Sequence, residues 1–295
     1  MNQRDLQKLR LFLVEVAQEA GLLINTAQPS ASTIDEKKNT TDIVTETDRK
    51  AEALIRKRLQ DQYPQFSFVG EESFDSKSGV SDEPTFIVDP IDGTSNFVHG
   101  FPEVCVSIGF VIKKQPTVGV VYNPFRNELW AATRGQGAFF CGVNGKQTLP
   151  FTRSSLEFEK ACIGLEWGSD REGPNFDLNL HVFTTLARTK RTGGRFVNSL
   201  RFTGSAALAI CRVAAGQQDA FWECGSWAWD VAASWCILTE AGGIMVDGHP
   251  GEWSPPIDGR RYLAVRPALE GQKEFVEQFW SVIGDKRSAY GKVLD

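Results

Sequence analysis

Apolar side chains recur at helical spacing in several parts of the chain. In residues 1–25 they lie three or four positions apart, interrupted by Arg10, Glu15 and Glu19, which predicts an amphipathic helix packed on a core. Similar patterns predict four later helices, at residues 49–63, 205–215, 230–241 and 271–283. The Gly242-Gly243 pair is a stop signal for the helix predicted at 230–241.

Short runs of β-branched and aromatic residues predict strands. The strands predicted at residues 66–69 and 85–88 are each followed by an acidic residue. Residues 104–140 contain several strand-like runs separated by turn residues, which predicts a β-meander. The strands predicted in the meander and in the second half are residues 105–112, 118–122, 128–132, 221–222, 244–246 and 262–265, with turns at 114–116 and 123–124. A polar stretch, residues 28–41, separates the first two predicted helices.

The order of these elements indicates the fold class. Strands and helices alternate in the second half, which favours an α/β layer, whereas the first half reads as α+β with a meander. We expect the boundary between them near residues 149–157. This gives an N-terminal part, residues 1–153, and a C-terminal part, residues 154–295, which together form one compact catalytic unit.

Composition narrows the class of protein. The 295 residues include 37 Asp and Glu against 32 Lys and Arg, a net charge of −5 that argues against nucleic-acid binding. No apolar run is long enough for a secretory signal or a membrane span, so we expect a cytoplasmic protein without a membrane partner. The six cysteines are scattered without a CxxC pair, which favours reduced thiols over a disulfide framework or a zinc site.

The most informative segment is the run from residue 87 to residue 97. An apolar strand runs into Asp89, Pro90 prevents that strand from continuing in register, and Asp92 follows three positions after Asp89. Gly93-Thr94 then supplies a tight turn with backbone N–H groups that attract anions. The two carboxylates would repel each other without a cation, and oxygen-only ligands favour Mg²⁺ or Mn²⁺ over Zn²⁺. A metal site beside an anion site suggests phosphoryl chemistry; the alternative is that both aspartates simply cap a turn.

Two other segments strengthen the first interpretation. Glu71 and Glu72 end the preceding predicted strand, and Asp230, directly after Trp227-Ala228-Trp229, begins a predicted helix. An acidic residue at a helix start is common by itself. The three acidic segments together form a stronger pattern than any one of them.

These segments resemble the three motifs of the inositol monophosphatases. The matching runs are Gly-Glu-Glu-Ser at 70–73, Asp-Pro-Ile-Asp-Gly-Thr-Ser-Asn-Phe at 89–97 and Trp-Asp-Val-Ala at 229–232. Residues 42–48 and 240–243 extend the resemblance over nearly the whole chain, and residues 250–253 are most similar to fungal members. Ser95 stands where the family usually has a threonine. The resemblance implies the layered αβαβα sandwich of the inositol monophosphatase and fructose-bisphosphatase type.

The resemblance also implies roles for individual residues. The first Mg²⁺ would be held by Glu71, Asp89 and the backbone carbonyl of Ile91, the second by Asp89, Asp92 and Asp230, and Glu71 would share a weaker third ion. Asp48 and Thr94 would orient and help deprotonate the attacking water, which makes them, with Glu71, the implied catalytic residues. The implied substrate contacts are Glu71, Ile91, Asp92, Gly93, Thr94, Gly204, Ser205, Ala206 and Glu223, with Ser169 as a further candidate. The N–H groups of Gly93 and Thr94 would grip the phosphate.

The implied activity is Mg²⁺-dependent hydrolysis of myo-inositol monophosphate by a metal-activated water, in inositol recycling and phosphoinositide supply. The resemblance further implies two or three Mg²⁺ ions per subunit, possible use of Mn²⁺, lithium sensitivity and a homodimer. Its substrate would be a small phosphate ester.

Several other activities compete with this one. A haloacid-dehalogenase-type phosphatase is disfavoured because its paired aspartates lie two apart rather than three, and a glycosidase would not explain the Gly-Thr anion site. Phosphatases of the same superfamily that act on sugar or histidinol phosphates, bisphosphate nucleotides or fructose bisphosphate stay open. A non-catalytic interaction protein on this fold would have lost a metal carboxylate or Thr94, and none of them is missing.

Overall fold

The computed structural model describes residues 1–27, 34–39, 42–75 and 79–290. Its helices are α1 (Gln3–Thr26), α2 (Glu46–Gln62), α3 (Thr94–His99), α4 (Gly173–Ala187), α5 (Ala206–Ala215), α6 (Ala228–Ala241) and α7 (Gln272–Ile283). Its strands are β1 (Ile34–Asn39), β2 (Asp42–Thr45), β3 (Ser67–Gly70), β4 (Thr85–Asp92), β5 (Cys105–Ile112), β6 (Gln115–Asn123), β7 (Glu128–Thr133), β8 (Ala138–Gly142), β9 (Gly145–Thr148), β10 (Cys162–Leu165), β11 (Ser199–Arg201), β12 (Ala220–Cys224), β13 (Ile244–Val246) and β14 (Arg261–Val265).

Two mixed sheets form the framework. The larger has seven strands in the order β3-β4-β5-β6-β7-β8-β9, and only the β3/β4 pair is parallel. The smaller has five strands in the order β11-β10-β12-β14-β13, with β10 parallel to both β11 and β12. A separate antiparallel pair, β1-β2, precedes α2.

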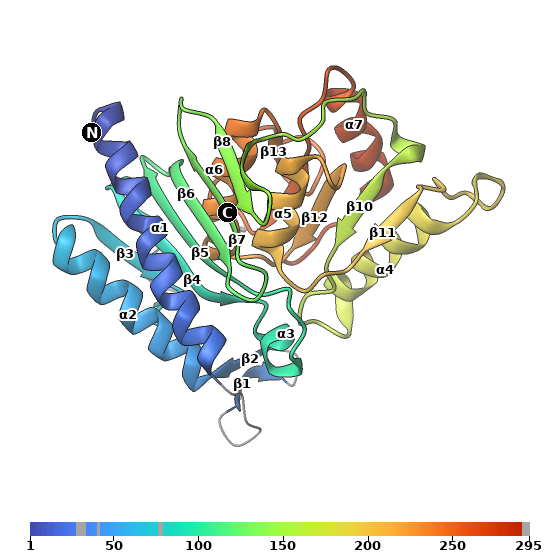
Figure 1. The fold of residues 1–295 in the computed structure, drawn as a ribbon. Coiled ribbons are helices and arrows are strands. Elements are labelled where there is room, and N and C mark those ends of the chain that lie inside the picture. Colours follow the sequence, from blue (N-terminus) through green and yellow to red (C-terminus); the bar gives the residue numbers. More distant parts are fainter. Residues whose placement is uncertain (28–33, 40–41, 76–78, 291–295) are drawn as a thin grey trace.

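Helices cover both sheets to give five layers (Figure 1). Helices α1 and α2 pack on one face of the larger sheet, α5 and α6 fill the space between the two sheets, and α4 and α7 lie on the outer side of the smaller sheet. Three buried apolar clusters occupy the interfaces between these layers. The predicted αβαβα sandwich is therefore confirmed. Its division at residues 153 and 154 stays a proposal.

Helix α6 approaches the larger sheet unusually closely. Gly109 of β5 and Gly119 of β6 lie opposite each other under this helix. A Cβ on Gly119 would lie 2.1 Å from the carbonyl oxygen of Ala233, and a Cβ on Gly109 would lie 2.8 Å from the Cβ of Ala232. Because these two positions carry no side chain, the start of α6 can reach the end of β4.

Most of the elements predicted from periodicity are confirmed, including the strands at 105–112 and 244–246 with the predicted bounds. The turn predicted at 114–116 is displaced: Lys113 and Lys114 form it with positive φ, and Gln115 and Pro116 already belong to β6. Helix α4 was not predicted because it opens with Gly-Pro-Asn and buries only a narrow stripe. Strand β1 lies in the polar stretch and has no apolar alternation, and the rest of that stretch before residue 42 lies outside the described residues.

Two further expectations concern the whole chain. All six cysteines are free, in agreement with the prediction of reduced thiols. Within the described part of the chain, no helix combines the length and the apolar character that a membrane crossing requires.

The close approach of α6 makes Gly119 a test of the packing. We expect Gly119→Ala to lower the free energy of unfolding by about 1–3 kcal/mol, because the methyl group must displace the backbone of α6. Val143→Ala, at a side chain that is 94% exposed, should change it by less than about 0.5 kcal/mol. Chemical denaturation measures both, and equal small effects would contradict the packing described.

Candidate active site

A bulge in β4 brings the two motif aspartates to one face of the sheet. Asp89 pairs with Ser107 of β5 and Asp92 with Cys105, so three steps on β4 match two steps on β5. Residues three apart on a regular strand point to opposite faces, and the one extra residue restores a common face. Pro90 lies inside this irregularity, where a missing N–H costs no ladder bond. The interruption of register predicted at Pro90 is confirmed, although the strand itself continues to Asp92.

Four acidic side chains meet at this point. Burial raises the pKa of Asp89 well above its usual value, and the charges of Glu71, Asp92 and Asp230 raise it further. Burial likewise raises the pKa of Asp230, with contributions from Asp92 and Glu71. Such mutual repulsion arises only among neighbouring carboxylates. The structure therefore gathers the three acidic segments, from β3, β4 and α6, at one place.

One oxygen of each aspartate in this cluster is fixed by the protein. Asp89 Oδ1 accepts a hydrogen bond from the N–H of Ile91 (2.9 Å), and Asp230 Oδ2 accepts one from the N–H of Trp227 (2.6 Å). Asp92 Oδ2 accepts from the Ser205 hydroxyl and the N–H of Ala207, both at 2.7 Å. These bonds oppose the effect of burial, which raises the pKa of Asp92 to about 6.

The donor set fits a hard divalent cation. It consists of carboxylate oxygens, it carries excess negative charge, and each aspartate keeps an oxygen that these hydrogen bonds do not use. Outer hydrogen bonds of this kind orient metal ligands. Within the described residues, no three acidic, cysteine or histidine side chains already stand in a coordinating arrangement, so binding an ion requires the carboxylates to converge.

A hydroxyl and a buried carboxylate lie beside this cluster. The Thr94 hydroxyl donates a shared hydrogen bond to Asp48 Oδ1, at 3.0 Å, and to the carbonyl oxygen of Ile91, at 3.1 Å. Asp48 also accepts hydrogen bonds from the N–H (2.9 Å) and the hydroxyl of Thr45. Burial raises the pKa of Asp48, and the hydrogen bonds from Thr45 and Thr94 oppose this rise.

Gly93 opens the short helix α3 with a left-handed φ of 97°. A Cβ there would lie 2.7 Å from the carbonyl oxygen of Glu103 and 3.2 Å from that of Gly204. The predicted turn at Gly93 thus packs directly against the segment that contains Gly204 and Ser205. This contact places the predicted phosphate side and the predicted alcohol side next to each other.

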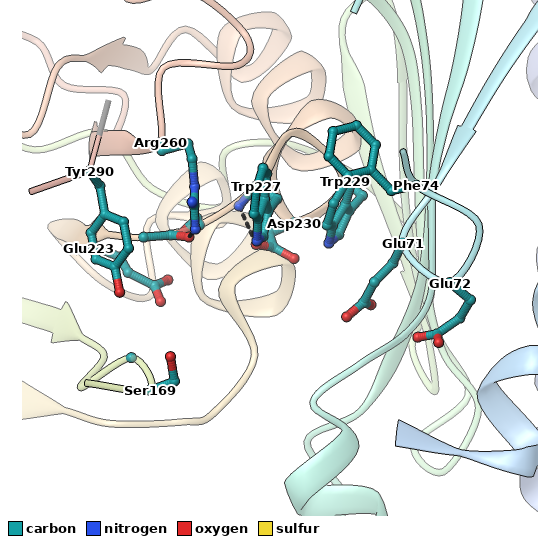
Figure 2. Close-up of a pocket in the computed structure, with 13 residues that line it drawn as sticks. Glu71, Glu72, Phe74, Ser169, Glu223, Trp227, Trp229, Asp230, Arg260 and Tyr290 are labelled. Atoms are coloured by element: carbon teal, nitrogen blue, oxygen red, sulfur yellow. Dashed lines mark hydrogen bonds between the residues drawn. The ribbon is translucent and has the colours of Figure 1, made fainter. Parts of the chain in front are cut away.

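A cavity of about 660 Å³ opens from the acidic cluster (Figure 2). Glu71 and Asp230 line it on one side and Glu223 and Ser169 on the other. Burial, followed by the charges of Glu166 and Asp230, raises the pKa of Glu223 well above its usual value, and its buried Oε2 has no hydrogen-bond partner within the described residues. Of the predicted site residues, Glu71, Ser169, Glu223 and Asp230 line this cavity. Asp89 and Asp92 adjoin it through their interactions with Glu71 and Asp230, and the roles of all the predicted residues stay proposals.

Sequence reasoning missed the residues that hold the loops of the site. Glu166 Oε1 accepts from the N–H groups of Thr203 (2.8 Å) and Gly204 (2.7 Å), and burial raises the pKa of Glu166 to about 7. Asn96 donates to the carbonyl oxygens of Thr203 (2.7 Å) and Glu103 (2.8 Å). Asn96 lies inside the main motif, and this position is the only sequence signal that could have indicated its role in holding the loops.

Glu52 is a third residue of this kind. It lies one helical turn after Asp48 on α2, is 4% exposed, and accepts a hydrogen bond from the N–H of Glu72 at 2.7 Å. A Cβ on Gly70 would lie 2.4 Å from Glu52 Oε2. One helix thus positions both the Asp48–Thr94 pair and the turn that carries Glu71.

Comparisons with known proteins agree with this geometry. The model of the inositol monophosphatase family matches residues 5–284. Inositol monophosphatase 2 of Saccharomyces cerevisiae is 47% identical over 252 residues, which cover 83% of this chain and 84% of the yeast protein. Inositol monophosphatase 1 of the same yeast is 39% identical over 291 residues, which cover 95% and 97%. The inositol monophosphate-bound structure of SaIMPase-II is 27% identical, with a TM-score of 0.71 and coverage of 93% of this chain and 94% of that one.

The contact between Glu52 and the Glu71 turn yields a testable expectation. Glu52→Ala should weaken Mg²⁺ binding about 10- to 100-fold, because the turn loses its hydrogen-bond acceptor. Glu52→Gln keeps an acceptor oxygen and should bind within about 3-fold of the wild type. Calorimetric titration with Mg²⁺ measures both.

Glu46→Ala serves as the matched control, because Glu46 lies on the same helix in an exposed pair with Lys50. A Glu52→Ala variant that binds Mg²⁺ like this control would show that Glu52 does not position the turn. A Glu52→Gln variant as weak as Glu52→Ala would show that its charge, rather than its hydrogen bond, is what counts.

Proposed function

Because the chain belongs to the inositol monophosphatase family, whose members are phosphoric monoester hydrolases, we propose that it hydrolyses myo-inositol monophosphate to myo-inositol and phosphate. The observation that carries this proposal is the buried cluster of carboxylates beside the Thr94–Asp48 pair, at the end of a cavity that also exposes Glu223. Two yeast relatives are named inositol monophosphatases, and a structural relative was solved with inositol monophosphate bound.

We propose Mg²⁺ as the cation, two or three per subunit, with Mn²⁺ as a substitute. Glu71, Asp89 and the Ile91 carbonyl would hold one ion, and Asp89, Asp92 and Asp230 another. Such ions lower the pKa of a bound water and stabilise negative charge on the phosphoryl group. The oxygen-only donor set and its excess negative charge support this assignment.

Thr94 and Asp48 would orient the attacking water and accept its proton. The Thr94 hydroxyl donates toward Asp48 and Ile91, so its own lone pairs are free to accept a hydrogen bond from water. The buried carboxylate of Asp48 stabilises positive charge that develops as the proton moves. The N–H groups of Gly93 and Thr94 would hold the phosphoryl oxygens.

The alcohol part of the substrate would lie between Glu223 and the segment Gly204-Ser205-Ala206, with Ser169 at the rim. Glu223 Oε2 lacks a partner within the described residues and is an acceptor for a substrate hydroxyl. Sugar or histidinol phosphates, bisphosphate nucleotides and fructose bisphosphate are the alternative substrates, and the names of the relatives favour inositol monophosphate over them. We also propose a cytoplasmic homodimer that is inhibited by lithium and serves inositol recycling.

Asp89 tests the metal site. In Asp89→Asn we expect Mg²⁺-dependent phosphate release from inositol monophosphate to fall at least about 100-fold. The metal-free variant should melt at the same or a higher temperature than the wild type, because a repelled buried charge is removed. The rise in melting temperature that Mg²⁺ causes should disappear with the activity.

Asp61→Asn, at an exposed partner of Lys57, is the matched control and should behave as the wild type. The metal assignment is wrong if folded Asp89→Asn protein retains substantial Mg²⁺-dependent activity, or if phosphate release by the wild type needs no metal.

Thr94 tests the water-activating pair separately. We expect Thr94→Val to lower kcat about 100- to 10,000-fold with little change in KM or in the Mg²⁺ requirement, because the proton acceptor is lost while the ligands remain. Thr94→Ser keeps the hydroxyl and should retain most of the rate. Steady-state kinetics over a range of Mg²⁺ concentrations distinguish the two outcomes, and an unchanged kcat in Thr94→Val would refute the role.

A further inference from the structure

A stacked arginine forms the wall of the cavity away from Glu71. Arg260 is the one residue with a cationic side chain among the described residues that line this cavity, and the other charged side chains there are acidic. Its guanidinium lies 3.5 Å from the ring centroid of Trp227 and 4.7 Å from that of Tyr290. Figure 2 shows it between the two rings, with its tip toward the Glu223 side of the cavity.

The stack leaves only an edge of the guanidinium for a ligand. Tyr290 and Trp227 cover its two faces, and the other face of Trp227 stacks on Trp229 with centroids 5.1 Å apart. Arg260 Nη2 donates to the carbonyl oxygen of Gly225 (2.5 Å), whereas within the described part of the chain Nε is buried without a partner and Nη1 donates no hydrogen bond. Because Tyr290 and Trp227 cover both faces of the guanidinium, a nucleobase cannot stack on it. The N–H groups without a partner can instead bind a hydrogen-bond acceptor.

Tyr290, held by contacts of its own hydroxyl and of the neighbouring Ala289, completes this wall. The Tyr290 hydroxyl donates to Asp170 Oδ2 (2.5 Å), and the N–H of Ala289 donates to Asn175 Oδ1 (2.6 Å). A Cβ on Gly225 would lie 3.0 Å from the Tyr290 ring. Tyr290 lies after residue 284, where the match to the family model ends.

Arg260 is held in place rather than neutralised. Its backbone has a left-handed φ of 62°, a conformation that a non-glycine residue adopts only when its surroundings hold it there. Within the described residues it forms no ion pair, although Glu223 and Asp230 line the same cavity. Arg260 and Glu223 both line the cavity, with Arg260 Nε and Glu223 Oε2 buried in its wall without hydrogen-bond partners within the described residues. Nη1 is then the guanidinium group that is left for a ligand.

We propose that the edge of Arg260 binds a second anionic group of the substrate, at the end of the alcohol part remote from the phosphate that is hydrolysed. The further substrates that the site accepts beside myo-inositol monophosphate are then polyol phosphates that also carry a carboxylate or a second phosphate. The hydroxyls of such a substrate donate hydrogen bonds to Glu223, and its anionic oxygens accept hydrogen bonds from the guanidinium of Arg260. These charge-assisted hydrogen bonds are about twice as strong as neutral ones. This inference rests on the proposed function, since it takes the position of the hydrolysed phosphate from it.

Matched substrate pairs test the inference. Glucitol 6-phosphate and 6-phosphogluconate differ in a carboxylate at the far end, and fructose 6-phosphate and fructose 1,6-bisphosphate differ in a second phosphate. We expect wild-type kcat/KM to favour the anionic member of at least one pair about 10- to 100-fold. A preference in the first pair identifies a carboxylate site, and a preference in the second identifies a phosphate site.

Variants at position 260 connect the preference to the stack. Arg260→Gln should abolish the preference and keep kcat/KM for the member without the second anion within about 3-fold. Arg260→Lys keeps the charge without the planar stack and should retain only part of the preference. Arg287→Gln, at an exposed arginine outside the cavity, is the matched control and should keep the full preference.

Ligand-induced shifts in melting temperature, measured on the same proteins, record binding whether or not phosphate is released. The inference is overturned if the wild type shows no preference in either pair, by rate or by binding, or if Arg260→Gln keeps it. Failure of the proposed function looks different: no compound releases phosphate with Mg²⁺, while the binding preference and its loss in Arg260→Gln can still be read.

Discussion

The repulsion among four neighbouring carboxylates, two of them buried, is the constraint on which the site depends. The charges of the neighbouring carboxylates, Glu71 and Asp92 among them, raise the pKa values of Asp89 and Asp230 beyond the effect of burial, and a stable fold holds such a cluster only if protons or cations neutralise it. The hydrogen bonds from Ile91, Ser205, Ala207 and Trp227 each fix one oxygen of an aspartate and orient the rest of the group. The framework therefore holds the negative charge in place for cations that the substrate phosphate can then share.

The site lies where the two sheets meet, so it needs the whole sandwich. The larger sheet supplies Asp89 and Asp92 on β4, and Glu71 directly follows its strand β3. The smaller sheet supplies Glu223 on β12, and α6 between the sheets supplies Asp230. The glycine pair at 109 and 119 lets α6 come close enough to complete the cluster. The Arg260 stack extends the same cavity with a cation, so its two ends offer complementary charge to a substrate.

Local signals carried most of what the sequence could predict. Periodicity located the long helices, and the acidic motifs identified the carboxylates because each sits at the end of an element that an apolar run defines. The bulge that brings Asp89 and Asp92 to the same face of the sheet depends on the pairing of β4 with β5, which no local pattern reveals. Glu52, Glu166 and Arg260 escaped prediction for the same reason, since each acts through a partner at least twenty residues away in the chain. Strand β1 forms by pairing with β2 and α4 packs against α7, and neither contact can be read from the pattern of the element itself.

Proton release on metal binding tests the central claim most directly. If the carboxylates are held close enough to keep raised pKa values without metal, Mg²⁺ must displace protons from them, and fewer as the pH rises above the pKa of about 6 at Asp92. Calorimetric titration of the metal-free protein with Mg²⁺, in buffers of different ionisation enthalpy between pH 6 and pH 8, counts these protons. We expect Mg²⁺ to bind with proton release that is larger at pH 6 than at pH 8. Binding without proton release at either pH, or no binding, would contradict it.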